Sequence, residues 1–123
     1  MQKSLRHEMK EESTELERVL WLHGQFRRSL EPLGVTPLQA GVLLYLHRHT
    51  DTNMTKTAAA VCIRLPTLTE VIDDLVRKRW VTRRHSTTDT RVVQLRLSSR
   101  GNALVVKIAH GVGQVATMPT SPD

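Results

Sequence analysis

The strongest constraint on the fold lies in residues 65–101, where the spacing of apolar residues changes from that of a helix to that of a strand. Apolar side chains first recur at steps of three and four, and they predict an amphipathic helix over residues 66–79. The members of this stripe are Leu68, Val71, Ile72, Leu75 and Val76. From residue 81 onward apolar and polar side chains alternate, which predicts a β-hairpin over residues 81–97.

The hairpin carries arginines on both strands and in its tip. Val93, Leu95 and Leu97 alternate with polar residues in a half-buried strand, and residues 81–85 are its expected partner across a polar loop at 86–90. A helix is narrow enough for the major groove of duplex DNA, and an adjoining hairpin with a cation at its tip can reach a neighbouring groove. The pattern therefore favours a DNA-binding unit.

The positive charge of the chain is concentrated in the same segment. The net charge is +6 over 123 residues, and residues 64–100 alone contain nine basic and four acidic residues. The basic residues are Arg64, Arg77, Lys78, Arg79, Arg83, Arg84, Arg91, Arg96 and Arg100. Such a face suits a phosphate backbone, although a solvated basic surface would show the same composition.

Helix signals precede this segment. Helical spacing of apolar residues predicts a helix over residues 13–31, ended by Pro32 and Gly34, with residues 1–12 as a frayed or helical extension. Thr36, Pro37 and Gln39 form a capping box with proline in the first turn, which predicts the start of a second helix.

A helix-turn-helix unit follows. Polar residues at 47–53 predict a loop, and the Ala-rich residues 54–63 predict a short helix joined by Arg64 and Leu65 to the helix over 66–79. Ser98 is the expected N-cap of a last helix over residues 99–117. The predicted fold is mainly α with a small β-wing: a single domain over 1–123, with a winged helix-turn-helix over 36–98 between terminal helices.

Three sequence motifs in this order resemble the MarR family of bacterial regulators. PTLTEVIDDLVRKRWVTR resembles the family's recognition helix and the start of its wing. Asp89-Thr90-Arg91 resembles the family's D-x-R wing motif. LSSRG at 97–101 resembles the L-T-x-x-G motif that follows the wing. The resemblance covers residues 36–101 well and the flanking helices loosely. Arg79 stands where the family usually has a glycine that ends the recognition helix.

The resemblance implies a homodimeric transcription regulator, here expected to be a repressor, on a near-palindromic operator. Each recognition helix would enter a major groove and each wing a minor groove, while helices 13–31 and 99–117 would form the dimer interface. Many members release DNA in response to a small aromatic acid, a metal or an oxidant, so a small-molecule effector or redox response remains an open alternative.

The candidate DNA-binding residues lie on the helix over 66–79 and on the wing. They are Arg64, Pro66, Thr67, Thr69, Arg77, Arg83, Arg84, Asp89 and Arg91. Arg91 at the wing tip is expected to enter the minor groove, and the alternative is a surface ion pair with Asp89, which itself would orient the wing. The hydroxyls of Thr67 and Thr69 can bond to bases or phosphates, and the alternative is a helix-capping role.

Other charged residues have more than one interpretation. Arg83 and Arg84 point to opposite faces of a strand, so only one is expected to face the duplex. Spacing of four residues predicts ion pairs Asp73–Arg77 and Asp74–Lys78 as an alternative to phosphate contacts. Glu70 could accept a hydrogen bond from a cytosine amino group, and the alternatives are that it tempers non-specific affinity or pairs locally.

Several functional classes are not expected. Cys62 lies among apolar residues and is expected to be a buried small hydrophobe rather than an oxidant sensor. His47 and His49 do not have a metal-binding spacing, so neither a metal nor another cofactor is expected. His23 and His110 fall on the terminal helices, where they would line a ligand or dimer cleft or simply pack. The sequence contains no catalytic motif, so the chain is not expected to be an enzyme.

Neither a signal peptide nor a membrane span is expected, and a single cysteine fits the reducing cytoplasm. The main alternative function is a winged-helix protein-interaction module without specific DNA contacts. The acidic residues Glu70, Asp73 and Asp74 would favour it if the outward face of the helix were negative without support from the wing arginines.

Overall fold

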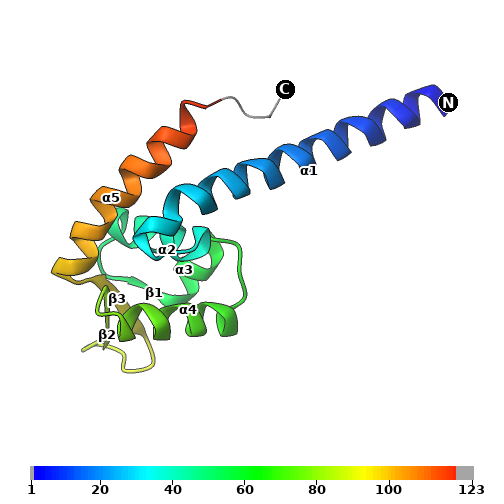
Figure 1. Cartoon of the computed structure of the whole chain (residues 1–123). Helices are drawn as coiled ribbons and strands as arrows, with labels where there is room; N and C mark the ends of the chain where they lie inside the picture. Colours follow the sequence, from blue (N-terminus) through cyan, green and yellow to red (C-terminus); the bar gives the residue numbers. More distant parts are fainter. Residues whose placement is uncertain (1, 119–123) are drawn as a thin grey trace.

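The computed structural model describes residues 2–118, in which helices pack with a small antiparallel sheet whose hairpin loop projects from one side of the molecule (Figure 1). In chain order the elements are α1 (Gln2–Leu30), the 3-10 helix η1 (Glu31–Leu33), α2 (Pro37–Arg48), β1 (Thr52–Asn53), α3 (Met54–Ala60), α4 (Leu65–Arg77), β2 (Val81–His85), β3 (Val93–Leu97) and α5 (Ser99–Ala116). This order confirms the predicted winged helix-turn-helix between two terminal helices. No helix of the described part is both long and apolar enough to cross a membrane.

The hydrophobic core lies among α2, α4, α5 and the sheet. Its fully buried large side chains include Leu43 of α2, Leu68, Ile72 and Leu75 of α4, Leu95 of β3 and Ile108 of α5. Burial of each such side chain stabilises the fold by about 1.5–3 kcal/mol relative to exposure. The stripe predicted for the recognition helix is therefore the face that anchors α4, and its opposite face is left outward.

The sheet has the strand order β1–β3–β2, and all neighbours are antiparallel. Pairing of Val81 with Leu97 and of His85 with Val93 confirms the predicted hairpin. The third strand corrects the prediction of a loop over 47–53, because α2 continues to Arg48 and residues 52–53 pair with β3. A strand of two residues is too short to show a period of its own.

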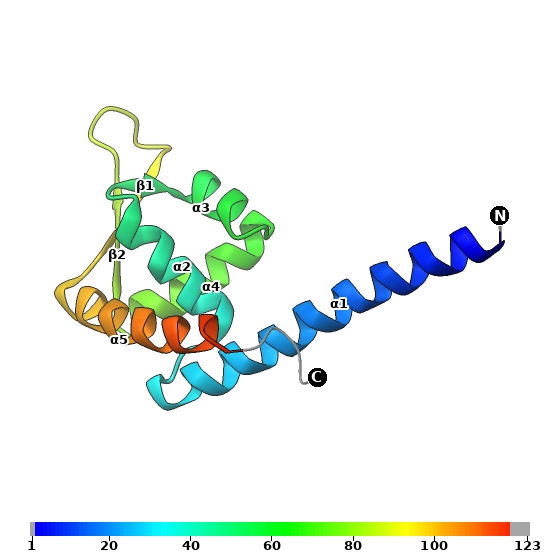
Figure 2. The same ribbon diagram turned by 90° about the horizontal axis from the view of Figure 1, so that it is seen from above.

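Helix α1 is longer than predicted and extends away from the other elements (Figures 1 and 2). The prediction placed its start at residue 13, whereas residues 2–12 are also helical, as the alternative of a helical extension allowed. That stretch contains neither glycine nor proline, so nothing in its backbone chemistry ends the helix. At its other end, Ser29 donates a hydrogen bond to the carbonyl oxygen of Gly111 in α5, at 3.1 Å.

Three side chains define helix starts. The Thr36 hydroxyl accepts from the backbone N–H of Gln39, and the Gln39 side-chain oxygen accepts from the N–H of Thr36, both at 3.1 Å, which confirms the capping box. The Ser98 hydroxyl accepts from the N–H of Gly101 at 3.0 Å, which confirms the N-cap of α5. Asn53 caps α3 in the same way: its side-chain oxygen Oδ1 accepts a hydrogen bond from the N–H of Lys56, at 2.9 Å.

Two helices of the helix-turn-helix unit end on an L-residue in the left-handed conformation. Cys62 (φ 56°) follows α3 and Arg79 (φ 65°) follows α4. In the second case the N–H of Arg79 bonds to the carbonyl of Val76 and the N–H of Trp80 to that of Leu75, the two hydrogen bonds of a Schellman motif. The left-handed residue ends α4 at Arg77, two residues before the predicted end at 79.

Cys62 is exposed, so the prediction of a buried cysteine is wrong. Its apolar neighbours in sequence suggested burial, but the chain turns at this residue to close α3. The N–H of Cys62 bonds to the carbonyl of Ala59 and the N–H of Ile63 to that of Ala58, again the Schellman pattern. The turn position, rather than the local composition, therefore sets the environment of the thiol.

Candidate nucleic-acid interface

The exposed side of α4 begins with residues that present backbone and hydroxyl groups to solvent. Arg64 is the N-cap residue without a side-chain cap, and Pro66 occupies the first turn. Thr67 and Thr69 are both exposed. The Thr69 hydroxyl donates to the carbonyl of Leu65 at 3.0 Å, which leaves its lone pairs and its methyl group available to an external partner.

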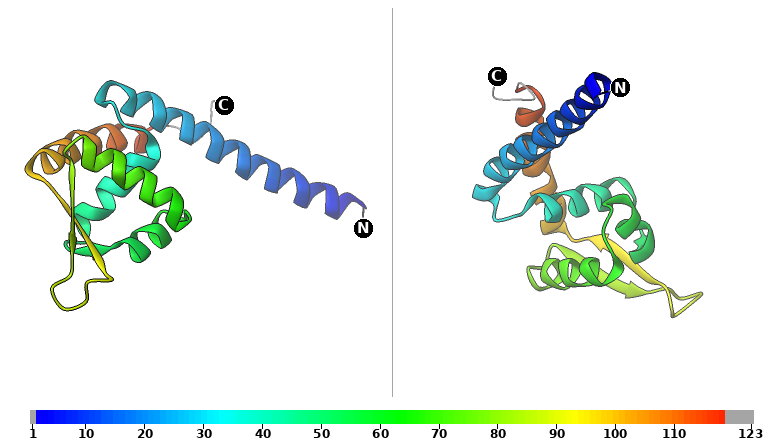
Figure 3. Two further views of the ribbon diagram at one scale, coloured as in Figure 1. Left: turned by 90° about the horizontal axis from the view of Figure 1, so that it is seen from below. Right: turned by 90° about the vertical axis from the view of Figure 1, so that its right-hand side faces the viewer.

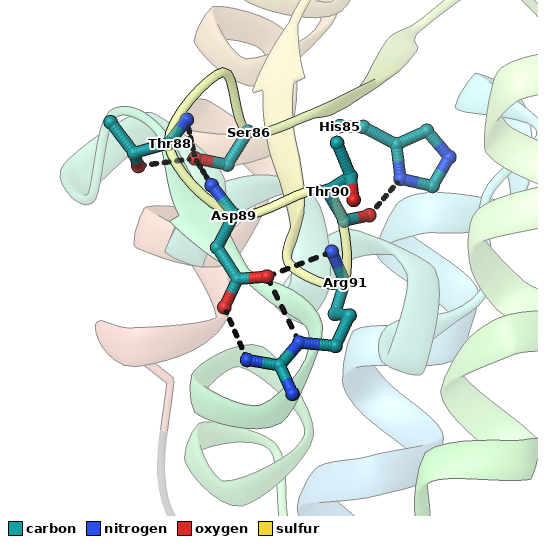
Figure 4. A network of polar contacts seen from close by, with 6 residues as sticks. All are labelled: His85, Ser86, Thr88, Asp89, Thr90 and Arg91. Atoms are coloured by element: carbon teal, nitrogen blue, oxygen red, sulfur yellow. Dashed lines mark hydrogen bonds and ion pairs between the residues drawn. The ribbon is translucent and has the colours of Figure 1, made fainter.

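The wing tip is held by a compact set of hydrogen bonds (Figure 4). The hydroxyl of the buried Ser86 accepts from the N–H groups of Thr88 and Asp89, at 3.2 and 3.3 Å. At the end of β2, the Nδ1–H of His85 donates a hydrogen bond across the loop to the carbonyl oxygen of Thr90, at 2.8 Å. These bonds give the predicted loop at 86–90 a defined shape from which the side chain of Arg91 extends.

Asp89 and Arg91 form an ion pair at this tip. The carboxylate accepts from Nε and Nη2 of Arg91 at 3.1 and 3.3 Å, and from the N–H of Arg91 at 3.1 Å. The side-chain bonds from Arg91, and then its backbone N–H, hold the pKa of Asp89 below its usual range. The Arg91 side chain is nevertheless 89% exposed, so the ion pair directs the guanidinium without covering it.

Arg83 and Arg84 leave the wing on opposite sides, as predicted. Arg83 forms an ion pair with Asp73 of α4, so it joins the wing to the recognition helix. Arg84 lies on the other face of the hairpin, paired with Gln94, and lines a pocket with Asp51 and Arg96 to which Arg83 also contributes. The predicted pair Asp73–Arg77 is therefore wrong, because the wing strand offers Asp73 a closer partner than its own helix does.

The second carboxylate of α4 has several partners. Asp74 pairs with Arg77 at 2.8 Å and with Lys78 at 3.2 Å, which confirms the predicted Asp74–Lys78 pair. It also accepts a hydrogen bond from Nε2 of Gln39 in α2, at 2.7 Å. Asp74 thus helps to hold α4 against α2, while Lys78 also lies over the ring of Trp80 at 5.3 Å.

A second ion pair between distant segments was not predicted. Arg96 of β3 donates from Nε and Nη2 to the two carboxylate oxygens of Asp51, at 2.9 and 2.7 Å. The hydrogen bond from Arg96 lowers the pKa of Asp51, and the carboxylate in turn raises the pKa of Arg96. The two residues are 45 positions apart, and only the pairing of β1 with β3 brings them together.

A cleft of about 410 Å³ separates the start of α4 from the wing. Its lining includes Leu65 and Thr69 of α4, Arg83 and Arg91 of the wing, and Asn53 before α3. The structure thus brings together three residues of the predicted set, Thr69, Arg83 and Arg91, beside Leu65. Arg84 lies outside this cleft, and Arg77 lies near the far end of α4.

The histidines whose side chains the structure describes form no ligand cluster. His49 stacks on Tyr45 with ring centroids 4.3 Å apart. His110 of α5 lines an open pocket beside the end of α1, together with Ser29, Leu33 and Lys107. Among residues 2–118 no group of three His, Cys, Asp or Glu residues could hold a metal ion.

Comparison with known proteins gives consistent matches. A model of the MarR family matches residues 35–93. The HTH-type transcriptional repressor MdtR of Bacillus subtilis (strain 168) is 31% identical over 83 residues, which cover 68% of this chain and 54% of MdtR. The chain spans about half the length of the curated relatives it matches.

Solved structures with the same fold include complexes with DNA. AbsC, a MarR family transcriptional regulator from Streptomyces coelicolor, has a TM-score of 0.83 at 25% identity, covering 89% of this chain and 76% of AbsC. A mutant of MarR from E. coli complexed with operator DNA has a TM-score of 0.74 at 27% identity. The match covers 79% of this chain and 69% of the MarR chain. The matched family consists of transcription regulators, in agreement with the prediction that the chain is not an enzyme.

Proposed function

Since this chain belongs to the MarR family, we propose that it is a cytoplasmic transcriptional regulator that binds double-stranded DNA sequence-specifically. The observation that carries the proposal is the cleft in which Thr69 of α4 and Arg91 of the wing face the same opening. In Figures 1 and 3, α4 and the wing lie together at the side of the molecule away from α1. This placement leaves both free to approach one duplex.

In the proposed complex, α4 lies in the major groove and the wing reaches the adjacent minor groove. The first turn of α4, with Pro66, Thr67 and Thr69, would contact base edges, and Arg64 and Arg77 would contact phosphates at its two ends. Arg91 would enter the negative potential of the minor groove, oriented by Asp89.

The wing arginines argue against the alternative of a protein-interaction module. The three acids of α4, Glu70, Asp73 and Asp74, are equalled in number by three bases: Arg77 and Lys78 on or next to the helix and Arg83 on the wing. Asp73 and Asp74 are engaged in ion pairs with these bases. The outward side of α4 is therefore not a net negative surface, which is the condition that would favour an acidic docking helix.

We infer that the protein acts as a homodimer on a near-palindromic operator. Leu16, Val19 and Leu20 on α1 are each about 60% exposed, and Val106 on α5 is 70% exposed. Large apolar side chains that cluster on two terminal helices are typical of a surface buried by a second copy. The double variant Leu16→Asp/Leu20→Asp should then be monomeric in sedimentation analysis, and an unchanged mass would contradict this interface.

The relative MdtR is a repressor, and we propose the same direction of regulation for this chain. The pocket beside Lys107 and His110 is the candidate position for a small-molecule effector, since it combines apolar walls with a cation and opens between the terminal helices. An anionic ligand would find a counter-charge there.

DNA binding is tested by titration of salt with the duplex upstream of the protein's own gene and with a scrambled duplex. We expect preference for the upstream duplex, with affinity that falls as salt rises. Arg91→Ala should weaken that binding about 5- to 150-fold if the guanidinium contacts base edges. Arg18→Ala on α1, which removes another exposed ion-paired arginine, is the matched control. Equal affinity of the Arg91→Ala variant would remove Arg91 from the interface.

A further inference from the structure

We propose that Glu70 determines base specificity: its carboxylate accepts a hydrogen bond from the N4 amino group of a cytosine in the major groove. The inference rests on the proposed DNA binding by α4. It adds the chemistry of one base position, which follows from the place of Glu70 on the helix and from the partners of the neighbouring acids.

Glu70 stands at the centre of the outward face of α4. At 100° per residue it lies about 160° around the helix from both Leu68 and Ile72, which are fully buried. To one side of it, Thr69 faces the cleft toward the wing, and to the other, Asp74 faces Gln39 of α2. A helix that enters a groove with this face forward presents Glu70 most directly to the base edges.

Glu70 is also the acid of α4 that has no partner within the described part of the chain. Asp73 is paired with Arg83, and Asp74 with Arg77 and Lys78. The Glu70 side chain is exposed, and its carboxylate forms no hydrogen bond or ion pair with any side chain that the structure describes. Of the three interpretations that the sequence allows for Glu70, the structure therefore argues against local pairing.

The unpaired carboxylate limits which base can face it. An ionised carboxylate only accepts hydrogen bonds. In the major groove cytosine offers the N4 donor, guanine offers only acceptors, and thymine offers an acceptor beside a methyl group. Adenine has a donor, but its N7 acceptor lies next to it and would repel the second carboxylate oxygen. Glu70 thus favours cytosine and disfavours guanine most strongly.

The remaining alternative is that Glu70 weakens binding to every sequence equally by repulsion from phosphates. The base contact and the general repulsion predict different effects on DNA binding when the charge of Glu70 is removed. Loss of a base contact changes the preference at one position of the site. Loss of a general repulsion raises the affinity for all duplexes by the same factor and leaves the preferred sequence unchanged.

The test is selection of bound duplexes from a randomised pool, followed by affinity measurements on duplexes with each base pair at the selected positions. Wild-type protein, Glu70→Gln, Glu70→Ala and the control Glu31→Gln are compared at one salt concentration. Glu31 is an exposed acid next to α1, so its variant reports the effect of one lost charge elsewhere on the surface.

We expect the wild-type protein and Glu31→Gln to select cytosine at one position of each half-site, with about tenfold or greater discrimination against guanine. Glu70→Gln should shift that position toward adenine, whose N6 and N7 match an amide, and Glu70→Ala should lose the preference there alone. An unchanged selected sequence in both Glu70 variants would overturn the inference while DNA binding stands. Failure of the wild-type protein to select any sequence would overturn the proposed function and this inference together.

Discussion

Arg79 occupies a backbone position that favours glycine, and its replacement by glycine should stabilise the protein. The residue follows α4 with φ of 65° and donates the N–H of a Schellman motif to Val76. Its side chain is exposed and forms no hydrogen bond or ion pair among the described residues. Its carbonyl accepts from the Ser98 hydroxyl at 2.6 Å, a backbone contact that glycine retains.

The size of the effect follows from two opposing terms. The left-handed conformation costs an L-residue about 1–2 kcal/mol because of the Cβ atom. Glycine is more flexible in the unfolded chain, which offsets roughly 0.5–1 kcal/mol of that gain. Arg79→Gly should therefore raise the free energy of unfolding by about 0.5–1 kcal/mol. With an unfolding entropy of about 260 cal/mol/K for a chain of this length, Tm rises by about 2–4 °C.

The assay is thermal and urea denaturation followed by circular dichroism at one fixed protein concentration, since association would shift Tm. Arg79→Ala is the decisive control, because it removes the same side chain but keeps the Cβ atom and its strain. Cys62→Gly repeats the test at the equivalent turn after α3 and should give a gain of similar size. If Arg79→Gly were no more stable than Arg79→Ala, the reasoning from backbone strain would be refuted.

Two other substitutions test contacts between distant segments. Gly101→Ala should lower the free energy of unfolding by about 3 kcal/mol in urea titrations, because a Cβ atom would stand 2.1 Å from the carbonyl oxygen of Trp80. Gly113→Ala, where nothing lies within 4 Å, should cost nothing, and equal losses would contradict the packing argument. Arg96 lowers the pKa of Asp51, so their pair stabilises the fold above about pH 4 and is lost as pH falls through the lowered pKa. The stability of the wild type, measured at a series of pH values, should fall more steeply below about pH 4 than that of Asp51→Asn, and equal slopes would exclude this contribution.

The parts of the structure that depend on neighbouring residues were predicted well. The capping box of Thr36 and Gln39 and the N-cap Ser98 act within three residues, so their spacing alone locates the start of α2 and of α5. The helical stripe and the alternating strand are likewise local periods, and they placed α4 and the hairpin. The end of α4 was less accurate because Arg79 adopts a conformation that arginine rarely favours.

The missed features depend on residues that are far apart in the chain. The strand at 52–53 exists only through its pairing with β3, and the ion pair of Asp51 with Arg96 follows from that pairing. The pairing of Asp73 with Arg83 depends on the packing of β2 beside α4. Spacing within a helix cannot report either contact, which is why the predicted Asp73–Arg77 pair was wrong.

These contacts also divide the basic residues of the wing by role. Arg83 holds one face of the sheet to α4, and Arg96 holds the other face to Asp51. Both arginines are thus engaged within the protein, one toward α4 and the other toward the turn before β1. Arg91 remains largely exposed at the tip, and Arg84 is exposed on the strand. Only cations that reach phosphates release counterions, so the salt dependence of binding should be shallower than the count of nine basic residues in 64–100 suggests.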